Sequence, residues 1–181
     1  MIYVILGFLM IRPLTQYELK RALERKISPF YSASLGSIQS ALRKLEELGW
    51  VTVSETLDGR RRKKIYTNTD TGKQTMLTWM LEPIPPQRME QDAATKLFFL
   101  GHLEPQQCLT VVTDIVRQLE QTMSDYETAA AIESRRQISA DVGSIARYQL
   151  HTLKLGLLHY QAMLDGFRQV QHELQAEQEE R

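Results

Sequence analysis

The sequence is poor in the residues that build disulfides, turns and metal clusters. It has one cysteine, Cys108, so it can form neither an internal disulfide nor a cysteine-based metal cluster. We interpret Cys108 as a small apolar residue inside a helix. Six prolines and nine glycines are few for 181 residues, which favours a helix-rich chain over an all-β one.

A membrane-spanning segment is also missing. An apolar stretch opens the chain as MIYVILGFLMIRPL, but it has no basic region and no small-residue cleavage site, so we do not interpret it as a signal peptide. It is also shorter than the ~20 residues of a membrane span. We therefore expect a cytoplasmic protein with no membrane partner. Its 43% apolar residues suffice for a folded core.

The residue patterns of catalysis are absent as well. No nucleophile–base pair, glycine-rich phosphate loop or pair of carboxylates stands out. The four histidines are His102, His151, His159 and His172, and their spacings do not suit metal ligands. We expect neither an enzyme nor a cofactor nor a metal site.

The charges balance overall but are divided unevenly along the chain. Residues 1–82 carry 13 Lys and Arg against 8 Asp and Glu, whereas residues 83–181 carry 9 against 14. A basic half followed by an acidic half indicates that the first half meets a polyanion. Nucleic acid is therefore a candidate partner in spite of the neutral total.

Capping residues mark helix starts within residues 1–82. Thr15 and Glu18 form a capping box, and Ser34 and Thr69 are N-caps. Between the third and fourth helices, WVTVSET and KIYTNT flank an Asp-Gly turn, which predicts a β-hairpin. Three helices, a hairpin and a fourth helix make a winged helix-turn-helix domain over 1–82. The expected ranges are 2–11, 15–26, 35–48, 50–56, 64–69 and 70–81, followed by a stiff Pro-rich linker over 83–87.

Residues 88–181 are expected to form a helical dimerisation domain, which makes the protein mainly α. One helix is predicted over 88–100, a second from Pro105 and a third from about Ser139. Both long helices repeat apolar residues at alternating spacings of three and four, as coiled coils do. The last helix has a second apolar face, and a second copy of the chain is the simplest cover for it. The expected dimer interface contains Leu109, Val112, Val116, Leu119, Met123, Leu150, Leu153, Leu157, Tyr160, Leu164 and Phe167.

The third helix and the hairpin carry the residues suited to double-stranded DNA. The expected buried stripe of the helix is Ile38, Ala41, Leu42, Leu45 and Leu48. With this stripe inward, Gln39 can pair with adenine and Arg43 can reach guanine or phosphate. Five consecutive cations in the hairpin suit a loop lying along a phosphate backbone. The candidate DNA-binding residues are Tyr17, Lys20, Ser32, Ser34, Gly36, Ser37, Gln39, Ser40, Arg43, Lys44, Arg60, Arg61, Arg62, Lys63 and Lys64.

Three segments in order, ILGFLMIRPLTQYELKRALE, GSIQSALRKLEELGWV and DGRRRKKIYTNTDTGK, resemble the PadR family of winged-helix transcriptional regulators. The resemblance covers about residues 2–82. The long helical second half is similar to members with a virulence-activator-type C-terminal dimerisation domain. The chain departs from the family pattern at Gln39, where members often have Tyr, and at Asn68, where they usually have an apolar residue. The resemblance implies a homodimeric regulator of a palindromic operator, more often a repressor than an activator.

The same resemblance implies a small-molecule site, since members of the family sense aromatic or drug-like molecules at the dimer interface. Trp79, Phe98 and Phe99 lie near the junction of the two halves and are the candidate ligand pocket. Aromatic side chains also fill interfaces that bind no ligand, so packing is the alternative interpretation.

Two other functions stay open. The protein could be a helical scaffold whose winged helix binds protein, since a fold does not dictate a function. A protein-binding domain has no need of five consecutive cations in its hairpin, however. The protein could also be a ligand sensor whose DNA affinity depends on an effector, which thermal-shift screening with aromatic acids would detect.

Overall fold

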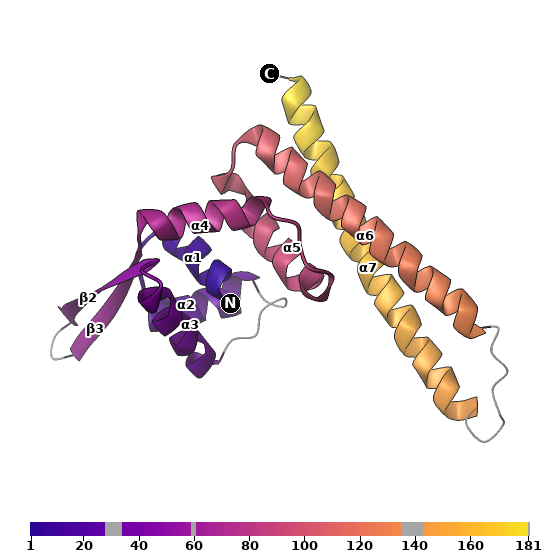
Figure 1. Ribbon diagram of the computed structural model, residues 1–181, viewed down its shortest axis with the longest axis horizontal. Helices are drawn as coiled ribbons and strands as arrows, with labels where there is room; N and C mark the ends of the chain where they lie inside the picture. Colours follow the sequence, from indigo (N-terminus) through magenta and orange to yellow (C-terminus); the bar gives the residue numbers. More distant parts are fainter. Residues whose placement is uncertain (28–33, 59–60, 135–142, 181) are drawn as a thin grey trace. The chain divides into compact units, whose positions relative to one another are not determined.

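The computed structural model describes residues 1–27, 34–58, 61–134 and 143–180, and the chain forms two compact units (Figure 1). The first unit is Met1–Leu103 and the second is Glu104–Arg181. Each unit has its own set of internal contacts and is described separately below.

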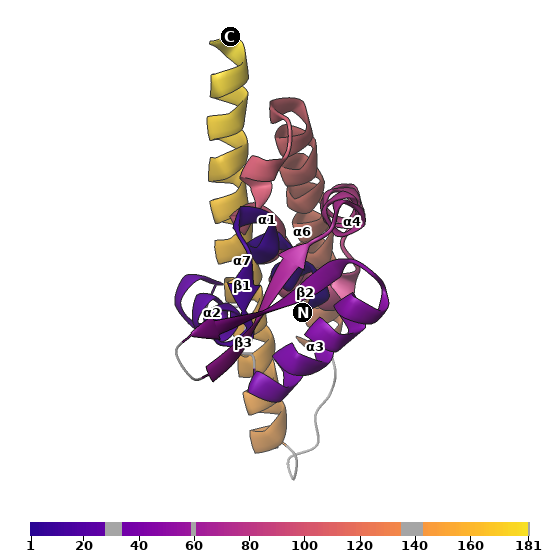
Figure 2. The ribbon, with the colours of Figure 1, turned by 90° about the vertical axis from the view of Figure 1, so that its left-hand side faces the viewer.

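The first unit is a winged helix-turn-helix followed by one further helix, so the predicted fold class is confirmed (Figures 1 and 2). Its three strands are all antiparallel and lie in the order β1-β3-β2. Strand β1 was not predicted, because two residues are too short to show a period. The elements are α1 (Ile2–Ile11), β1 (Leu14–Thr15), α2 (Gln16–Ala22), the π-helical turn η1 (Leu23–Ile27), α3 (Leu35–Glu47), β2 (Val51–Asp58), β3 (Arg61–Asn68), α4 (Asp70–Leu81), the 3₁₀ turn η2 (Pro86–Arg88), α5 (Met89–Phe98) and the 3₁₀ turn η3 (Leu100–His102).

The helix starts follow from the capping residues. The Thr15 hydroxyl accepts a hydrogen bond from the Glu18 amide at 3.2 Å, and the Glu18 carboxylate accepts one from the Thr15 amide at 2.9 Å. The Ser34 hydroxyl accepts the Ser37 amide at 3.1 Å, and Thr69 caps α4 in the same way. These bonds satisfy amides that have no partner within the helix. The three predicted caps are confirmed.

Helix α1 is the centre of the first unit. Its residues Val4, Ile5 and Leu6 are fully buried, and Phe8 and Leu9 are almost so. A helix that is apolar on all sides must be covered on all sides. In this unit α2, α3, α4 and β3 all contact α1. The core is therefore built around α1, and this core holds the helix-turn-helix and the hairpin together.

Helix α5 also belongs to the first unit. A Cβ atom on Gly7 of α1 would lie 2.5 Å from the Phe99 ring, so only glycine lets the end of α5 approach this closely. The buried Lys96 donates to the Glu82 carbonyl oxygen and lies 5.2 Å from the centre of the Trp79 ring. Along the chain, the boundary between the two compact units lies after Leu103. The functional division at the linker 83–87 stays a prediction.

The second unit is a helical hairpin of α6 (Pro105–Ser134) and α7 (Gly143–Glu179), which lie side by side in Figure 1. Arg168 of α7 donates to Glu120 of α6 at 2.7 Å, and the rings of Tyr126 and Tyr160 are 5.6 Å apart. As the numbers rise on one helix they fall on the other, so the pair is antiparallel. The predicted start of the last helix near Ser139 lies outside the described residues.

The hairpin is packed at one end and open at the other. Val112, Leu119 and Leu164 are buried, whereas Leu155 is 68% exposed and Leu158 is 69% exposed. We call the exposed large apolar side chains of this unit the open set. They are Tyr126, Ile132, Ile145, Tyr148, Leu150, Leu155 and Leu158. Within the described residues, no helix is both long and apolar enough to cross a membrane.

Candidate nucleic-acid interface

Helix α3 presents a polar face to solvent. Ile38, Ala41, Leu42 and Leu45 are buried against the core, as expected. The expectation that Leu48 is buried is wrong, because α3 ends at Glu47 and Leu48 is 46% exposed. Most of the predicted DNA-binding residues of this helix are exposed together on its opposite side. They are Gly36, Ser37, Gln39, Ser40, Arg43 and Lys44.

The first turn of α3 is held in place by local hydrogen bonds. The Ser37 hydroxyl donates to the Ser34 carbonyl oxygen at 2.8 Å, in addition to the Ser34 cap. Gln16 at the start of α2 donates from Nε2 to the Leu35 carbonyl oxygen at 3.1 Å and so ties α2 to α3. Ser34 therefore caps α3, as predicted, and Ser37 adds a second hydrogen bond to the same turn. A role of these serines in DNA binding stays a prediction. The predicted Ser32 lies outside the described residues.

The cations of the hairpin lie in a strand, not in a loop. Strand β3 begins at Arg61, so the expectation of a basic loop is wrong for residues 61–63, whereas Lys64 lies in the strand as predicted. Because side chains alternate along a strand, Arg62 and Lys64 share one face of β3 and Lys63 lies on the other. The Arg62 guanidinium lies 3.6 Å from the Glu55 carboxylate, in an exposed ion pair. The predicted Arg60 lies outside the described residues.

A groove of about 790 Å³ lies between the start of α2 and the hairpin. Tyr17, which is 70% exposed, is in the lining, and Leu57, Lys63 and Lys64 come from the hairpin. Tyr66 is also part of it, and burial raises the pKa of its phenol, so this group stays neutral at physiological pH. Sequence reasoning missed Gln16, Leu57 and Tyr66, which no motif distinguishes from ordinary helix and strand residues.

The remaining cations near this surface differ in their surroundings. Lys20 on α2 lies 3.5 Å from Glu24, one turn later on the chain, and both side chains are exposed. Among the described residues, neither Arg43 nor Lys44 makes an ion pair. Their charges are therefore available to a partner that approaches α3.

The three aromatic residues of the predicted ligand pocket lie in two clusters within the first unit. Trp79 stacks on Tyr3 with 4.5 Å between ring centres. Phe98 and Phe99 pack edge to face at 4.8 Å, and both contact Phe8. A ligand role for these residues stays a prediction.

Part of the predicted dimer interface is already buried within one chain. Val112, Val116, Leu119, Leu164 and Phe167 are all buried in a single copy of the hairpin. The other predicted residues are half-buried or, in Leu150, exposed. They are Leu109, Met123, Leu153, Leu157, Tyr160 and Leu150. The interface stays a prediction, and the open set adds candidates to it.

Two family models match the chain. Residues 5–77 match the Transcriptional regulator PadR-like family, and residues 91–175 match the Virulence activator alpha C-term domain. Over residues 5–77 the chain thus has a domain of the PadR-like family of transcriptional regulators. The resemblance seen in the sequence is confirmed, both for the winged helix and for the helical second half. The second family match begins inside α5, which packs in the first unit.

Curated relatives of this PadR-like protein are also regulators. It is 29% identical over 127 residues to the negative transcriptional regulator PadR of Bacillus subtilis. The aligned residues cover 69% of this chain and 70% of the Bacillus protein. It is 28% identical over 173 residues to a probable transcriptional regulator of Mycobacterium tuberculosis. The aligned residues cover 88% of this chain and 89% of the mycobacterial protein.

Solved structures include two of Bacillus subtilis PadR. The complex with operator DNA is 24% identical, with a TM-score of 0.46, and the match covers 96% of this chain and 98% of that chain. The complex with p-coumaric acid is 23% identical, with a TM-score of 0.40, and the match covers 96% of this chain and 94% of that chain.

Proposed function

We propose that this PadR-like protein is a cytoplasmic, homodimeric DNA-binding repressor of a palindromic operator, and that it has no catalytic role. The observation that carries the proposal is that the exposed polar face of α3 and the basic strand β3 belong to elements that both pack on α1. A partner that meets both surfaces must offer a groove for a helix and a line of negative charge. Double-stranded DNA offers both.

Each exposed side chain has a distinct task in this mechanism. The N-terminal turns of α3 enter the major groove, where Gln39 pairs with adenine and Arg43 reaches guanine or phosphate. Arg62 and Lys64 share a face of the hairpin and contact phosphates, which adds affinity without sequence preference. Tyr17 lies in the groove next to the same hairpin and adds a backbone contact.

The second unit pairs two copies of the chain. Its open set is a large apolar surface, and such surfaces mark sites of association. A symmetric dimer places its two α3 helices about 34 Å apart, one turn of B-DNA, so that each helix reads one half-site. The repressor role is supported by the name of the Bacillus subtilis relative, a negative regulator.

The DNA affinity of this repressor responds to a small aromatic effector. The aromatic clusters of Trp79 and of Phe98 with Phe99 are the candidate positions from the sequence. Thermal-shift measurements with p-coumarate test this proposal, because a ligand that binds the native state raises the unfolding midpoint. Unchanged midpoints with p-coumarate and with other aromatic acids would contradict an aromatic effector.

The first test of DNA binding is a mobility shift on DNA from upstream of the protein's own gene, with unrelated DNA as competitor. A shift that resists the competitor, with protection of a two-fold symmetric site, is the expected result. Absence of binding even at low salt would contradict the proposal and favour a winged helix that binds protein.

Salt dependence separates the tasks of α3 and the hairpin. Replacing Arg62 and Lys64 by Ala should weaken binding to every sequence alike and reduce the slope of log K against log salt by about 2, since each phosphate contact contributes about 0.9. The control removes two exposed cations of the second unit, Arg117 and Lys154. An unchanged slope in the hairpin variant would remove the hairpin from the interface.

A further inference from the structure

The first residue of α2 is a glutamine whose side chain reaches another helix. Gln16 donates from Nε2 to the carbonyl oxygen of Leu35, the first residue of α3, at 3.1 Å. The two residues are 19 positions apart in the sequence, so this bond joins separate elements and does not cap a single helix. Among the described residues, it is the only hydrogen bond between α2 and α3.

The oxygen atom that Gln16 contacts also belongs to the backbone ladder of α3. In an α-helix each amide donates to the carbonyl four residues earlier, so the Leu35 oxygen is the acceptor for the Gln39 amide. A carbonyl oxygen has two lone pairs and can accept both bonds. Gln39 is the residue expected to pair with adenine. The side chain of Gln16 is therefore connected through one oxygen atom to the backbone of Gln39.

The first turn of α3 needs such a connection. The first amides of a helix have no carbonyl partner within it, so helix ends open readily. The bonds between Ser34 and Ser37 close this turn but attach it to no other element. Ile38, the first buried residue of the helix, comes three residues after Leu35. The bond from Gln16 thus attaches the exposed first turn to a neighbouring helix.

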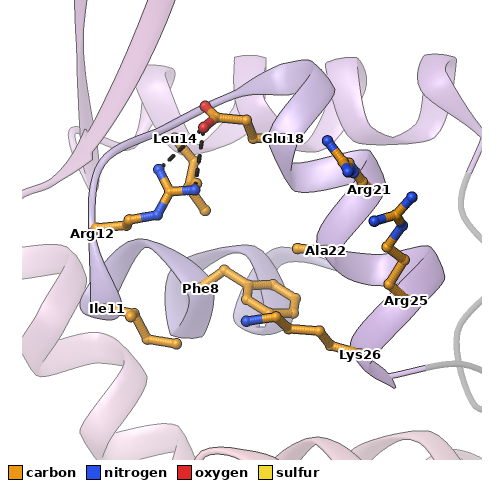
Figure 3. Close-up of a pocket in the computed structure, with 9 residues that line it drawn as sticks. All are labelled: Phe8, Ile11, Arg12, Leu14, Glu18, Arg21, Ala22, Arg25 and Lys26. Carbon is orange, nitrogen blue, oxygen red and sulfur yellow. Dashed lines mark hydrogen bonds and ion pairs between the residues drawn. The ribbon is translucent and has the colours of Figure 1, made fainter.

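Gln16 can act as an anchor because the backbone around it is fixed. Thr15, the residue before it, pairs with strand β3 and forms the capping box with Glu18. The Glu18 carboxylate also accepts hydrogen bonds from both terminal nitrogens of Arg12 at 3.2 Å. Figure 3 shows this ion pair in the lining of a cavity of about 290 Å³ beside Phe8, between α1 and α2. Gln16 therefore lies where the hairpin, α2 and α3 are joined.

We propose that Gln16 is a positioning residue for base recognition, a step that rests on the proposed function. By binding the Leu35 carbonyl oxygen, its side chain fixes the first turn of α3 relative to α2, and with it the place of Gln39 in the major groove. The paired hydrogen bonds between glutamine and adenine depend on orientation, so a turn that moves loses discrimination between bases. Phosphate contacts carry no sequence information and tolerate such movement.

The bond becomes stronger when DNA is bound. In the free protein it is exposed, and water competes for both the amide and the carbonyl. Gln16 lines the groove together with Lys63 and Lys64, so it lies on the surface that DNA covers. Exclusion of water by DNA lowers the local dielectric constant and strengthens the hydrogen bond. Loss of Gln16 should therefore change operator recognition more than it changes the stability of the fold.

The first test needs no DNA. Gln16→Met removes the donor and keeps an unbranched side chain of similar length. In the full-length variant, the amides of Ile38 and Gln39 should exchange with deuterium at least threefold faster, because the first turn of α3 opens more often. Gln74→Met makes the same change at an exposed position of α4 and should leave these rates unchanged. Unchanged rates in Gln16→Met would refute the positioning role.

The second test measures discrimination between bases. The wild type should bind the operator about tenfold more tightly than an operator with the adenine of Gln39 replaced. Gln16→Met should reduce this ratio at least threefold without changing the salt dependence. Gln16→Lys restores a donor of similar reach and should recover the ratio. In the Gln39→Ala background, Gln16→Met should not lower the ratio further, since the two residues act as one unit.

The outcomes separate this inference from the proposed function. A protein that binds no operator would refute the proposed function, whereas the exchange rates alone decide whether Gln16 fixes the first turn of α3. Faster exchange with an unchanged ratio would refute the role in base recognition. A ratio that falls as much in the Gln39→Ala background as in the wild type would also refute it, because Gln16 would then act through another residue.

Discussion

The two units of this protein bury their apolar residues to different extents. The first unit buries residues 4–9 of α1 without a break, and its exposed apolar side chains are scattered over several elements. The hairpin of the second unit buries Val112, Leu119 and Leu164 at one end, yet leaves the open set at the other. The exposed residues of the second unit are concentrated between Tyr126 and Leu158, so they form one region of one hairpin.

This difference indicates a division of tasks. A unit that completes its own core can present polar groups, such as Gln39 and Arg43, on a fixed surface. We expect a unit that exposes Leu155 and Leu158 to be completed by association, because burying such side chains yields about 1.5–3 kcal/mol each. The first unit should therefore be sensitive to substitutions in its core, and the second to substitutions on its surface.

The largest expected effect is on the core of the first unit. Ile5→Ala should lower the free energy of unfolding by about 2–5 kcal/mol, because Ile5 is fully buried at the centre of the core. Urea unfolding followed by tryptophan fluorescence measures it, since Trp50 and Trp79, the two tryptophans, both lie in this unit. The matched control on the same helix is Ile11→Ala at an exposed position. Equal costs at the two positions would contradict a core centred on α1.

The next effect concerns the surface of the second unit. Leu155→Asp with Leu158→Asp should raise the dimer dissociation constant about 100-fold, which corresponds to about 2.7 kcal/mol, because charges would replace apolar contacts. Sedimentation measures the dimer, and fluorescence unfolding should show the first unit unchanged. Gln149→Asp with Thr152→Asp adds the same charge at polar positions of α7 and serves as the control. A variant that stays dimeric would exclude the open set from the interface.

A smaller effect links the two units through DNA. Arg43→Ala should cost about 1–3 kcal/mol of operator binding and relax the sequence preference, if Arg43 reads a base. In the monomeric Leu155/Leu158 variant the same substitution should cost about half as much, because only one α3 is lost. Titrations on full and half operators provide the comparison. Equal losses in dimer and monomer would mean that the two α3 helices do not act together.

The smallest effect is local to the start of α2. Glu18→Gln should destabilise the first unit by about 1 kcal/mol at pH 7, through a weaker capping box and the lost ion pair with Arg12. The folded state lowers the pKa of Glu18, so this stabilisation is present above the pKa of an unfolded glutamate and disappears as the pH falls through the folded value. Unfolding of both proteins at pH 7 and at pH 3 checks this. If the two proteins still differ in free energy of unfolding at pH 3 as much as at pH 7, the ionised Glu18 carboxylate is not the source of the stabilisation.

Much of the interface could be predicted because its signals are local. Ser34 and Thr69 mark their helices through hydrogen bonds three residues along the chain, and the alternation of WVTVSET needs only its own residues. The start of β3 at Arg61 was missed because four consecutive charged residues show no alternation of apolar and polar side chains. For the same reason the faces of the hairpin cations became clear only from the strand register.

Local chemistry along the chain thus sets the helix starts, the hairpin, the order of elements and the exposed face of α3, since each depends on neighbours a few residues away. Contacts between distant segments decide the rest. Gly7 must meet Phe99 before α5 can join the first unit, and Leu48 and Leu155 are exposed because no other element in the described part of the chain covers them. The cavity beside Phe8 likewise arises where α1 and α2 come together. Burial depends on packing partners, and the spacing of residues in one segment does not identify those partners.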